Sequence, residues 1–126
     1  MISHEALQSC VEGNSILVLA TVVDKFVSAE GTRSEADTLS VQIVKILNGA
    51  GKGTMTLWGG FGRRKQFDAL NVGSNYLFAV KHPSHIPYKN HGGMSSVQDF
   101  LAVPAGTEDQ VINAHLEAFS NFRARK

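Results

Sequence analysis

Apolar and polar residues alternate over short runs of the chain, as they do in half-buried β-strands. Tyr76, Phe78 and Val80, for example, fall on one side of their run, because successive side chains of a strand point to opposite faces. Five runs of this kind cover residues 15–27, 38–47, 54–58, 75–81 and 99–103. Polar, glycine-containing connections separate them, so the pattern predicts five strands.

Two of the predicted strands change phase partway along, which indicates that they bend. The apolar positions of 38–47 are at first the odd-numbered ones, and then Val44 and Ile46 take over the apolar role. A one-residue bulge produces such a shift. The first strand shifts in a similar way between Val23 and Phe26. Because bulges let a small sheet curl, these shifts favour closure.

A helix is predicted at each end of the chain. Before the first strand, apolar residues recur at helical spacing over 4–10, with Ser3 as N-cap and Gly13 as the stop. After the last strand, Thr107 and Gln110 form a capping-box pattern. The apolar stripe of this second helix contains Ile112, Leu116 and Phe119, extended by His115 and Phe122.

This order of elements predicts a mainly β fold in a single domain over residues 1–126. No helix separates the strands, so a βαβ arrangement is excluded. We expect a five-stranded antiparallel OB-like barrel with a short N-terminal helix and a C-terminal helix, because closure removes exposed strand edges. An open sheet covered by two helices is the alternative.

Composition indicates a folded, soluble domain without a strong electrostatic field. Hydrophobic residues make up 43% and charged residues 18%, with a net charge of +1. Such a balance gives no field to attract a polyanion. The single cysteine, Cys10, excludes an intrachain disulfide. No apolar run approaches the ~20 residues of a membrane span, and no signal peptide is visible. We therefore expect a cytoplasmic protein, or an extracytoplasmic one if a signal peptide has been removed.

Several short segments resemble the netrin-like superfamily, which includes the tissue inhibitors of metalloproteinases. Residues 4–10 (HEALQSC), followed by 16–23 (ILVLATVV), look like the opening helix and long first strand of that group. Residues 41–49 (VQIVKILNG) are similar to its second strand, and 73–78 (GSNYLF) to its Gly-x-x-Tyr-Leu strand. The resemblance spans roughly residues 4–103 in element order and implies an OB-like barrel flanked by helices.

The resemblance does not carry metalloproteinase inhibition with it. In that family, the amine and carbonyl of an N-terminal cysteine chelate the protease zinc, within a Cys-x-Cys start. This chain begins with Met1, Ile2 and Ser3, and Cys10 has no partner cysteine. A protease inhibitor of a non-chelating type is therefore kept only as a further alternative, since fold analogy alone does not assign function.

Patterns for catalysis and for metal binding are lacking. No Gly-x-Ser-x-Gly motif occurs, and Gly53 separates Lys52 from Thr54 where a Walker A loop needs them adjacent. His82, His85 and His91 share one connection, but no acidic residue or cysteine lies between the first and the last. We interpret them as surface histidines, and we predict no enzyme, no cofactor and no metal.

Two long connections, 59–74 and 82–98, are where we expect recognition, because long loops on a compact scaffold tend to carry function. The first follows Trp58 and combines aromatic and basic side chains with glycines, and Tyr88 adds an aromatic side chain in the second. The predicted ligand-binding residues are Trp58, Phe61, Arg63, Arg64, Lys65 and Tyr88.

The preferred hypothesis is a non-enzymatic binding module that recognises a protein or a small ligand through these two loops, as a monomer or weak homodimer. The alternative is binding of single-stranded nucleic acid or another anion by the segment from Trp58 to Lys65, since cations beside aromatic rings suit a phosphate backbone and stacked bases. In a purely structural interpretation, the aromatic side chains of this segment plug one end of the core and its cations stay solvated.

Overall fold

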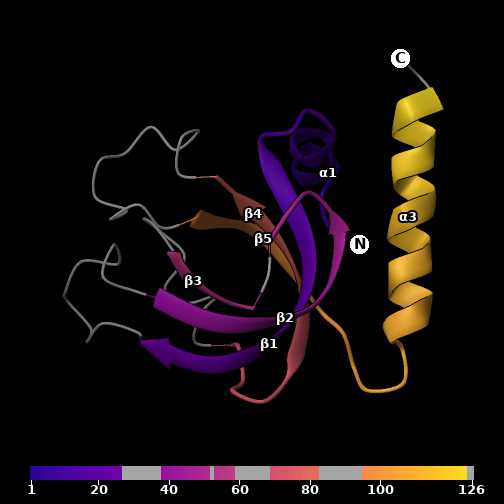
Figure 1. Ribbon diagram of the computed structural model, residues 1–126. Coiled ribbons are helices and arrows are strands. Elements are labelled where there is room, and N and C mark those ends of the chain that lie inside the picture. Colours follow the sequence, from indigo (N-terminus) through magenta and orange to yellow (C-terminus); the bar gives the residue numbers. More distant parts are fainter. Residues whose placement is uncertain (27–37, 52, 59–68, 83–94, 125–126) are drawn as a thin grey trace.

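The computed structural model describes residues 1–26, 38–51, 53–58, 69–82 and 95–124 (Figure 1). Its elements are α1 (His4–Val11), β1 (Ser15–Phe26), β2 (Thr38–Asn48), β3 (Thr54–Trp58), β4 (Asn75–Lys81), β5 (Ser95–Ala102) and α3 (Glu108–Ala124). The mainly β class, the five strands and the two terminal helices are confirmed. The strand β5 begins at Ser95, four residues before the predicted start at Asp99.

The five strands form one mixed sheet that closes on itself. They are hydrogen-bonded in the order β1-β2-β3-β5-β4, and β4 also pairs with β1. The strands β3 and β5 are parallel, with Leu57 opposite Ser95 and Trp58 opposite Ser96, so the wholly antiparallel sheet we expected is wrong for this pair. The reason is that β4 pairs with β1 and not with β3. The strand β2 is antiparallel to β1 and β3 is antiparallel to β2, so β3 runs in the direction of β1. In the same way, β4 is antiparallel to β1 and β5 to β4, so β5 also runs in the direction of β1.

The ladder between β1 and β2 is irregular at three places, which bends both strands. At one of them, successive residues of β1 face Lys45 and Ile43, so that Val44 is an extra residue on β2. At another, Val23 is an extra residue on β1. The predicted phase changes thus correspond to bulges. The expectation that Val44 takes an apolar position is wrong, because its side chain is 59% exposed, whereas Ile46 packs against the core.

Apolar side chains fill the inside of the closed sheet. Alternate residues of the strands point inward, as the period of two requires. This inner cluster consists of Ile16, Val18, Ala20, Val22, Leu39, Val41, Leu57, Leu70, Tyr76, Phe78, Val80 and Val97.

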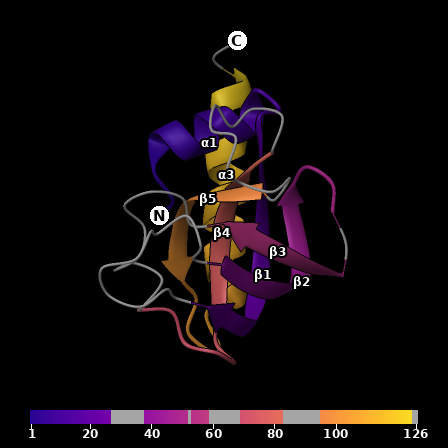
Figure 2. The same cartoon turned by 90° about the vertical axis from the view of Figure 1, so that its left-hand side faces the viewer.

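A second apolar layer lies between the outside of the sheet and the two helices. Figures 1 and 2 show α3 alongside the sheet, with α1 packed near it. The cluster joins Ile2, Ala6, Leu7, Cys10, Leu17, Leu19, Leu77, Ala79, Val103, Ile112 and Phe119. Because the first half of β1 and the middle of β4 are covered on both faces, residues 15–20 and 76–80 are all buried. This explains why these two strands are apolar runs without strict alternation.

The two helices begin differently. The hydroxyl of Ser3 accepts a hydrogen bond from the Ala6 N–H, 3.3 Å away, as predicted for an N-cap. The predicted cap of α3 is corrected, because the Thr107 hydroxyl donates to the Pro104 carbonyl at 2.7 Å, while the Glu108 carboxylate accepts from the Gly106 N–H at 2.9 Å. No helix in the described part of the chain is long and apolar enough to cross a membrane.

The buried face of α3 differs from the predicted stripe at one position. Ile112, His115 and Phe119 are buried, whereas Leu116 is exposed. Residues 112, 115 and 119 follow the helical spacing of three and four, so they share one face and Leu116 lies at its edge. His115, which the sequence pattern placed as an extension of the stripe, is therefore part of the packed layer, and Leu116 is not.

Candidate functional site

The predicted ligand-binding residues are represented in the structure by Trp58. The remaining residues, Phe61, Arg63, Arg64, Lys65 and Tyr88, lie outside the described residues. The side chain of Trp58, at the end of β3, is 1% exposed. A ring buried to this degree offers no free face for a base or another ligand, so at this position we read Trp58 as a packing residue.

The predicted surface histidines are described for one position of three. His82 is partly buried, and its backbone N–H donates to the Asn14 carbonyl at 3.2 Å. His85 and His91 lie outside the described residues. Among the residues that the structure describes, no three histidine, cysteine or carboxylate side chains come together as metal ligands.

Cys10 is a buried, unreactive thiol. Its side chain is nearly inaccessible in the layer between α1 and the sheet, as predicted for a small apolar residue. Burial raises the pKa of the Cys10 thiol to about 11, because desolvation disfavours the charged thiolate. Since the thiolate is the nucleophilic form, this cysteine is not suited to covalent catalysis at neutral pH.

Where β2 pairs with β3, the outer face carries four uncharged polar side chains. Ser40 pairs with Thr56 and Gln42 pairs with Thr54, on the side opposite to the buried Leu39. The same face also carries Trp58, whose ring is buried, and the exposed Lys45, which lies opposite Leu19 on β1. Apart from Lys45, the accessible groups at these positions are hydroxyls and an amide.

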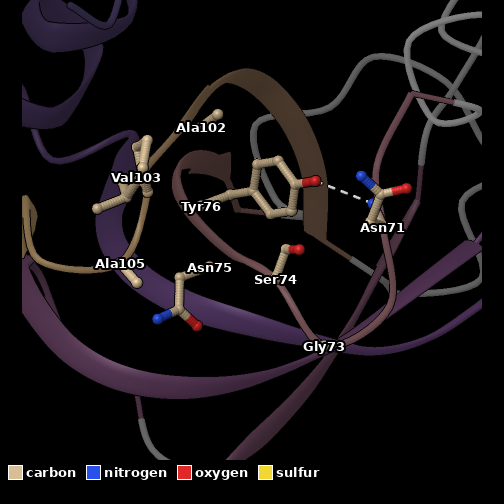
Figure 3. Close-up of a pocket in the computed structure, with 9 residues that line it drawn as sticks. Asn71, Gly73, Ser74, Asn75, Tyr76, Ala102, Val103 and Ala105 are labelled. Atoms are coloured by element: carbon tan, nitrogen blue, oxygen red, sulfur yellow. Dashed lines mark hydrogen bonds between the residues drawn. The ribbon is translucent and has the colours of Figure 1, made fainter.

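A pocket of about 350 Å³ opens where β4 begins and β5 ends (Figure 3). It lies between the segment that leads into β4 and the connection from β5 to α3. Its lining residues are Asn71, Gly73, Ser74, Asn75, Tyr76, Ala102, Val103, Pro104 and Ala105. Both walls thus come from the ends of neighbouring strands, which positions them relative to each other.

One wall is tied to β1 by backbone hydrogen bonds. The Gly73 N–H donates to the Val22 carbonyl at 2.7 Å, and the Val22 N–H donates to the Ser74 carbonyl at 3.0 Å. Ser74 in turn donates from its N–H to the Asn71 carbonyl at 3.2 Å. The turn needs a φ of +92° at Gly73, which favours glycine. This wall is therefore held in place by the sheet.

The other wall is tied to β4 and to the start of α3. The Val103 N–H donates to the Asn75 carbonyl at 3.1 Å, and the Val103 side chain is buried in the outer apolar layer. The Pro104 carbonyl accepts from the Thr107 N–H at 3.1 Å as well as from its hydroxyl. Ala102, Pro104 and Ala105 then remain exposed at the pocket.

Tyr76 joins the pocket to the inside of the sheet. Its side chain is 5% exposed, and its ring centroid lies 5.8 Å from that of Phe78 and 6.3 Å from that of Phe100. Its hydroxyl oxygen accepts a hydrogen bond from the Asn71 N–H at 2.9 Å, as the dashed line in Figure 3 shows. A tyrosine hydroxyl also carries one proton. The structure records no acceptor for this proton among the described residues.

The polar groups of the pocket are uncharged. The Thr21 hydroxyl donates to Oδ1 of Asn75 at 2.5 Å, which fixes the amide and leaves its NH₂ group as a donor. Ser74 and Asn71 add a hydroxyl and a second amide, and both residues are exposed. The nine described lining residues include no Lys, Arg, His, Asp or Glu. The pocket therefore combines neutral donors with an apolar wall.

Sequence reasoning did not identify Asn75 and Tyr76 as site residues. Both were assigned to a strand, which is correct, and Tyr76 was placed on the apolar face of that strand. The available signal was the polar run Gly73-Ser74-Asn75 directly before a tyrosine, because a strand end with turn residues is a common place for binding groups.

A second pocket, of about 270 Å³, lies between α1 and α3. It is lined by Met1, Ile2, His4, Leu7, Ala118, Asn121 and Phe122. The rings of His4 and Phe122 contact each other across it, with centroids 4.8 Å apart. Its lining is mainly apolar, and it lacks the group of fixed donors found at the first pocket.

Two comparisons of the sequence were negative. No protein-family model matches the chain, and no curated protein sequence matches it. The resemblance to the netrin-like superfamily therefore stays a prediction, and function is inferred from the site.

Proposed function

We propose that this protein is a non-enzymatic binding module of OB-like, netrin-like form that binds a small ligand in the pocket between Asn71–Tyr76 and Ala102–Ala105. A strand order of β1-β2-β3-β5-β4 with β4 returning to β1 supports the OB-like assignment. The predicted loop 59–74 contributes its last residues to this pocket. The other wall is the connection after β5 and not the predicted loop 82–98.

The observation that carries this proposal is a pocket of about 350 Å³ whose walls are fixed by the sheet and whose buried tyrosine carries a hydroxyl proton with no recorded acceptor among the described residues. Ligand sites usually measure about 300–1,000 Å³ and combine apolar surface with a few placed polar groups. The described lining holds no histidine, carboxylate or lysine that could act as a general base for Ser74 or Tyr76. Binding, and not catalysis, is the activity that these groups support.

Binding of single-stranded nucleic acid by the segment from Trp58 to Lys65 is the alternative. The buried ring of Trp58 speaks against it. It predicts binding that weakens steeply with salt and is reduced when Arg63 and Arg64 are both replaced by alanine. Inhibition of a protease by a non-chelating mode gains no support from the described surfaces.

The proposal is tested by screening a library of small fragments by NMR with the ¹⁵N-labelled protein. Ala105→Trp should block the pocket, because Ala105 is exposed and lines it. The matched control is Ala50→Trp, at an exposed site in the turn after β2. We expect bound fragments to shift the amide signals of 71–76 and 102–105 in the wild type and in the control, and not in the blocked variant.

Two results would contradict the proposal. One is a screen in which no fragment shifts the pocket signals. The other is binding that the Ala105→Trp variant leaves unchanged. A single-stranded oligonucleotide, added at low salt, serves as the comparison ligand. If it binds while the fragments do not, the nucleic-acid alternative replaces the small-ligand proposal.

A further inference from the structure

We infer that the pocket between Asn71–Tyr76 and Ala102–Ala105 takes a small, uncharged, oxygen-rich ligand, of which a neutral monosaccharide unit is the simplest example. This inference rests on the proposed function and names its ligand class. Three properties of the pocket lead to it: its volume, the absence of charge in its described lining, and the division of its walls into a hydrogen-bonding side and an apolar side.

The volume limits the size of the ligand. A pocket of about 350 Å³ lies at the lower end of the roughly 300–1,000 Å³ that ligand sites usually measure. This favours a small ligand, and a single sugar unit fits within it.

The lining selects against charge. A charged group that leaves water needs a partner of opposite charge, and the nine described lining residues supply none. The ammonium of Lys25 lies beyond the lining and donates to the Leu70 carbonyl at 2.7 Å. A phosphate or carboxylate on the ligand would therefore lose hydration without gaining an ion pair, whereas a hydroxyl group would exchange one neutral hydrogen bond for another.

The hydrogen-bonding wall offers donors to the ligand. The Tyr76 hydroxyl proton and the NH₂ group of Asn75 have no recorded acceptor among the described residues, and bonds to Asn71 and Thr21 fix both side chains. The two residues follow each other in β4, so their side chains lie on opposite faces of the strand and present separate donors. Donors held in this way lose little freedom on binding. Oxygen atoms of hydroxyl, ether or carbonyl groups on the ligand would satisfy them, which favours an oxygen-rich molecule.

The opposite wall is apolar. Figure 3 shows Val103 and Ala105 on the side of Tyr76 that faces away from Asn71. The Val103 side chain is buried in the outer layer, so the exposed hydrocarbon surface comes from Ala102, Pro104 and Ala105. A pyranose ring has a similar division, with C–H groups on its faces and hydroxyl groups around its rim. Such a ring can contact the apolar wall and one of the donors at the same time.

The test compares sugars that share one ring and differ in charge. Glucose and N-acetylglucosamine are titrated by NMR beside glucuronate, glucosamine and glucose 6-phosphate. We expect the neutral sugars to shift the signals of 71–76 and 102–105 saturably, and the charged sugars to bind at least about ten-fold more weakly. Equal or tighter binding of the charged sugars would overturn the inference.

Two variants examine the basis of the selectivity. Tyr76→Phe removes the donor and should weaken binding of the neutral sugars about five-fold, whereas Ser40→Ala, which removes a hydroxyl from the outer face of β2, should leave it unchanged. Ala105→Lys places a cation at the pocket and should make glucose 6-phosphate bind more tightly than glucose. If Tyr76→Phe does not fold, Ala105→Lys alone decides the test. Sugar binding that is unchanged in both variants contradicts the inference.

The experiment separates failure of the inference from failure of the proposed function. If fragments bind in the pocket and Ala105→Trp displaces them, but no neutral sugar binds, the binding module stands and the ligand class is wrong. If neither fragments nor sugars shift the pocket signals, the proposed function fails and the inference fails with it.

Discussion

Gly49 determines how closely the turn after β2 approaches the first strand. Its φ is +101°, in the region that favours glycine. A Cβ atom at this position would overlap Cγ2 of Ile16 and would lie 2.8 Å from Cβ of Ile16. Ile16 is buried inside the closed sheet, so its side chain has little room to move away. Two separate constraints, one conformational and one of packing, therefore require glycine at position 49.

We expect Gly49→Ala to lower the free energy of unfolding by about 2–4 kcal/mol, since it adds backbone strain and a clash in the core. Gly53→Ala is the matched control. Gly53 also has a positive φ, +68°, but its added Cβ would meet no described atom within 4 Å, so we expect a loss of only about 1–2 kcal/mol. Urea unfolding measures both losses. Equal losses would show that Ile16 does not restrict this turn.

At the scale of elements, a chain of side-chain hydrogen bonds fixes α1 to the sheet. The Ser15 hydroxyl in β1 donates to Oε1 of Gln98 in β5 at 2.8 Å, and lies 2.7 Å from the Ser9 hydroxyl in α1. Because Ser15 has one hydroxyl proton and gives it to Gln98, Ser9 is the donor to Ser15. Asn48 adds a bond from Nδ2 to the Cys10 carbonyl at 2.9 Å. The end of α1 is thus bonded directly to β1 and β2, and through Ser15 to β5.

We expect Ser15→Ala to destabilise the protein by about 1–2 kcal/mol, because it leaves both partners of a buried hydroxyl without it. Ser9→Ala is the control, since it keeps the bond between Ser15 and Gln98 and should cost less than about 1 kcal/mol. In the Ser15 variant, hydrogen exchange of the α1 amides should accelerate more than that of the β4 amides. If exchange accelerates equally in α1 and β4, or if both variants lose the same free energy of unfolding, Ser15 does not anchor α1 to the sheet.

The elements were predictable to the extent that apolar residues mark them. The ends of β3 follow from alternation, and those of β4 from an unbroken apolar run between the polar residues Asn75 and Lys81. The first half of β5 could not be predicted in this way. Ser95, Ser96 and Gln98 are polar. Ser95 and Ser96 pair with β3, Ser96 also pairs with β4, and Ser15 bonds to Gln98. Such pairing depends on the closed sheet and leaves no local signal.

The candidate site was less predictable than the fold. The sequence indicated the loop 59–74 as a place for recognition, and Trp58 was among the predicted ligand-binding residues. The structure buries the ring of Trp58. Tyr76 was read as a core residue, and its ring is indeed in the core. Its role at the pocket arises from the Asn71 N–H, which the turn at Gly73 brings to its hydroxyl. That contact depends on a backbone path that the residue types do not specify.

At the scale of the whole molecule, His115 connects the two ends of the described chain. The Ile2 N–H donates to its Nε2 at 3.2 Å, across 113 residues of sequence. Its Nδ1 lies 2.8 Å from the Val111 carbonyl, and a carbonyl can only accept, so Nδ1 carries the proton. The bond from Ile2 therefore requires neutral imidazole, because Nε2 can accept a hydrogen bond only while it carries no proton, whereas the bond to Val111 exists in either charge state. Close by, the Asp99 carboxylate accepts from the Ser3 N–H at 2.8 Å, which gives the N-terminal segment a second anchor.

Burial lowers the pKa of His115 below its ordinary value of 6.5. The bond to the Val111 carbonyl opposes this shift, and the positive charge on the amino group of Met1 adds to it. The unfolded chain thus takes up a proton on His115 at a higher pH than the folded chain does. Stability from the neutral ring is present in full above about pH 6.5, and it is lost as the pH falls toward the lowered pKa.

We therefore expect the free energy of unfolding to decline between pH 7 and pH 5, with at most about 1.4 kcal/mol per pH unit due to this one proton. His115→Phe removes the titrating group and keeps a ring in the packed layer. The other histidines are the same in both proteins, so their contributions to the pH dependence of stability cancel in the comparison. Urea unfolding from pH 8 to pH 5 should show the variant with the shallower decline. A difference in stability that stays constant with pH would mean that His115 contributes packing alone, because only a group that binds a proton differently in the two states can change the slope.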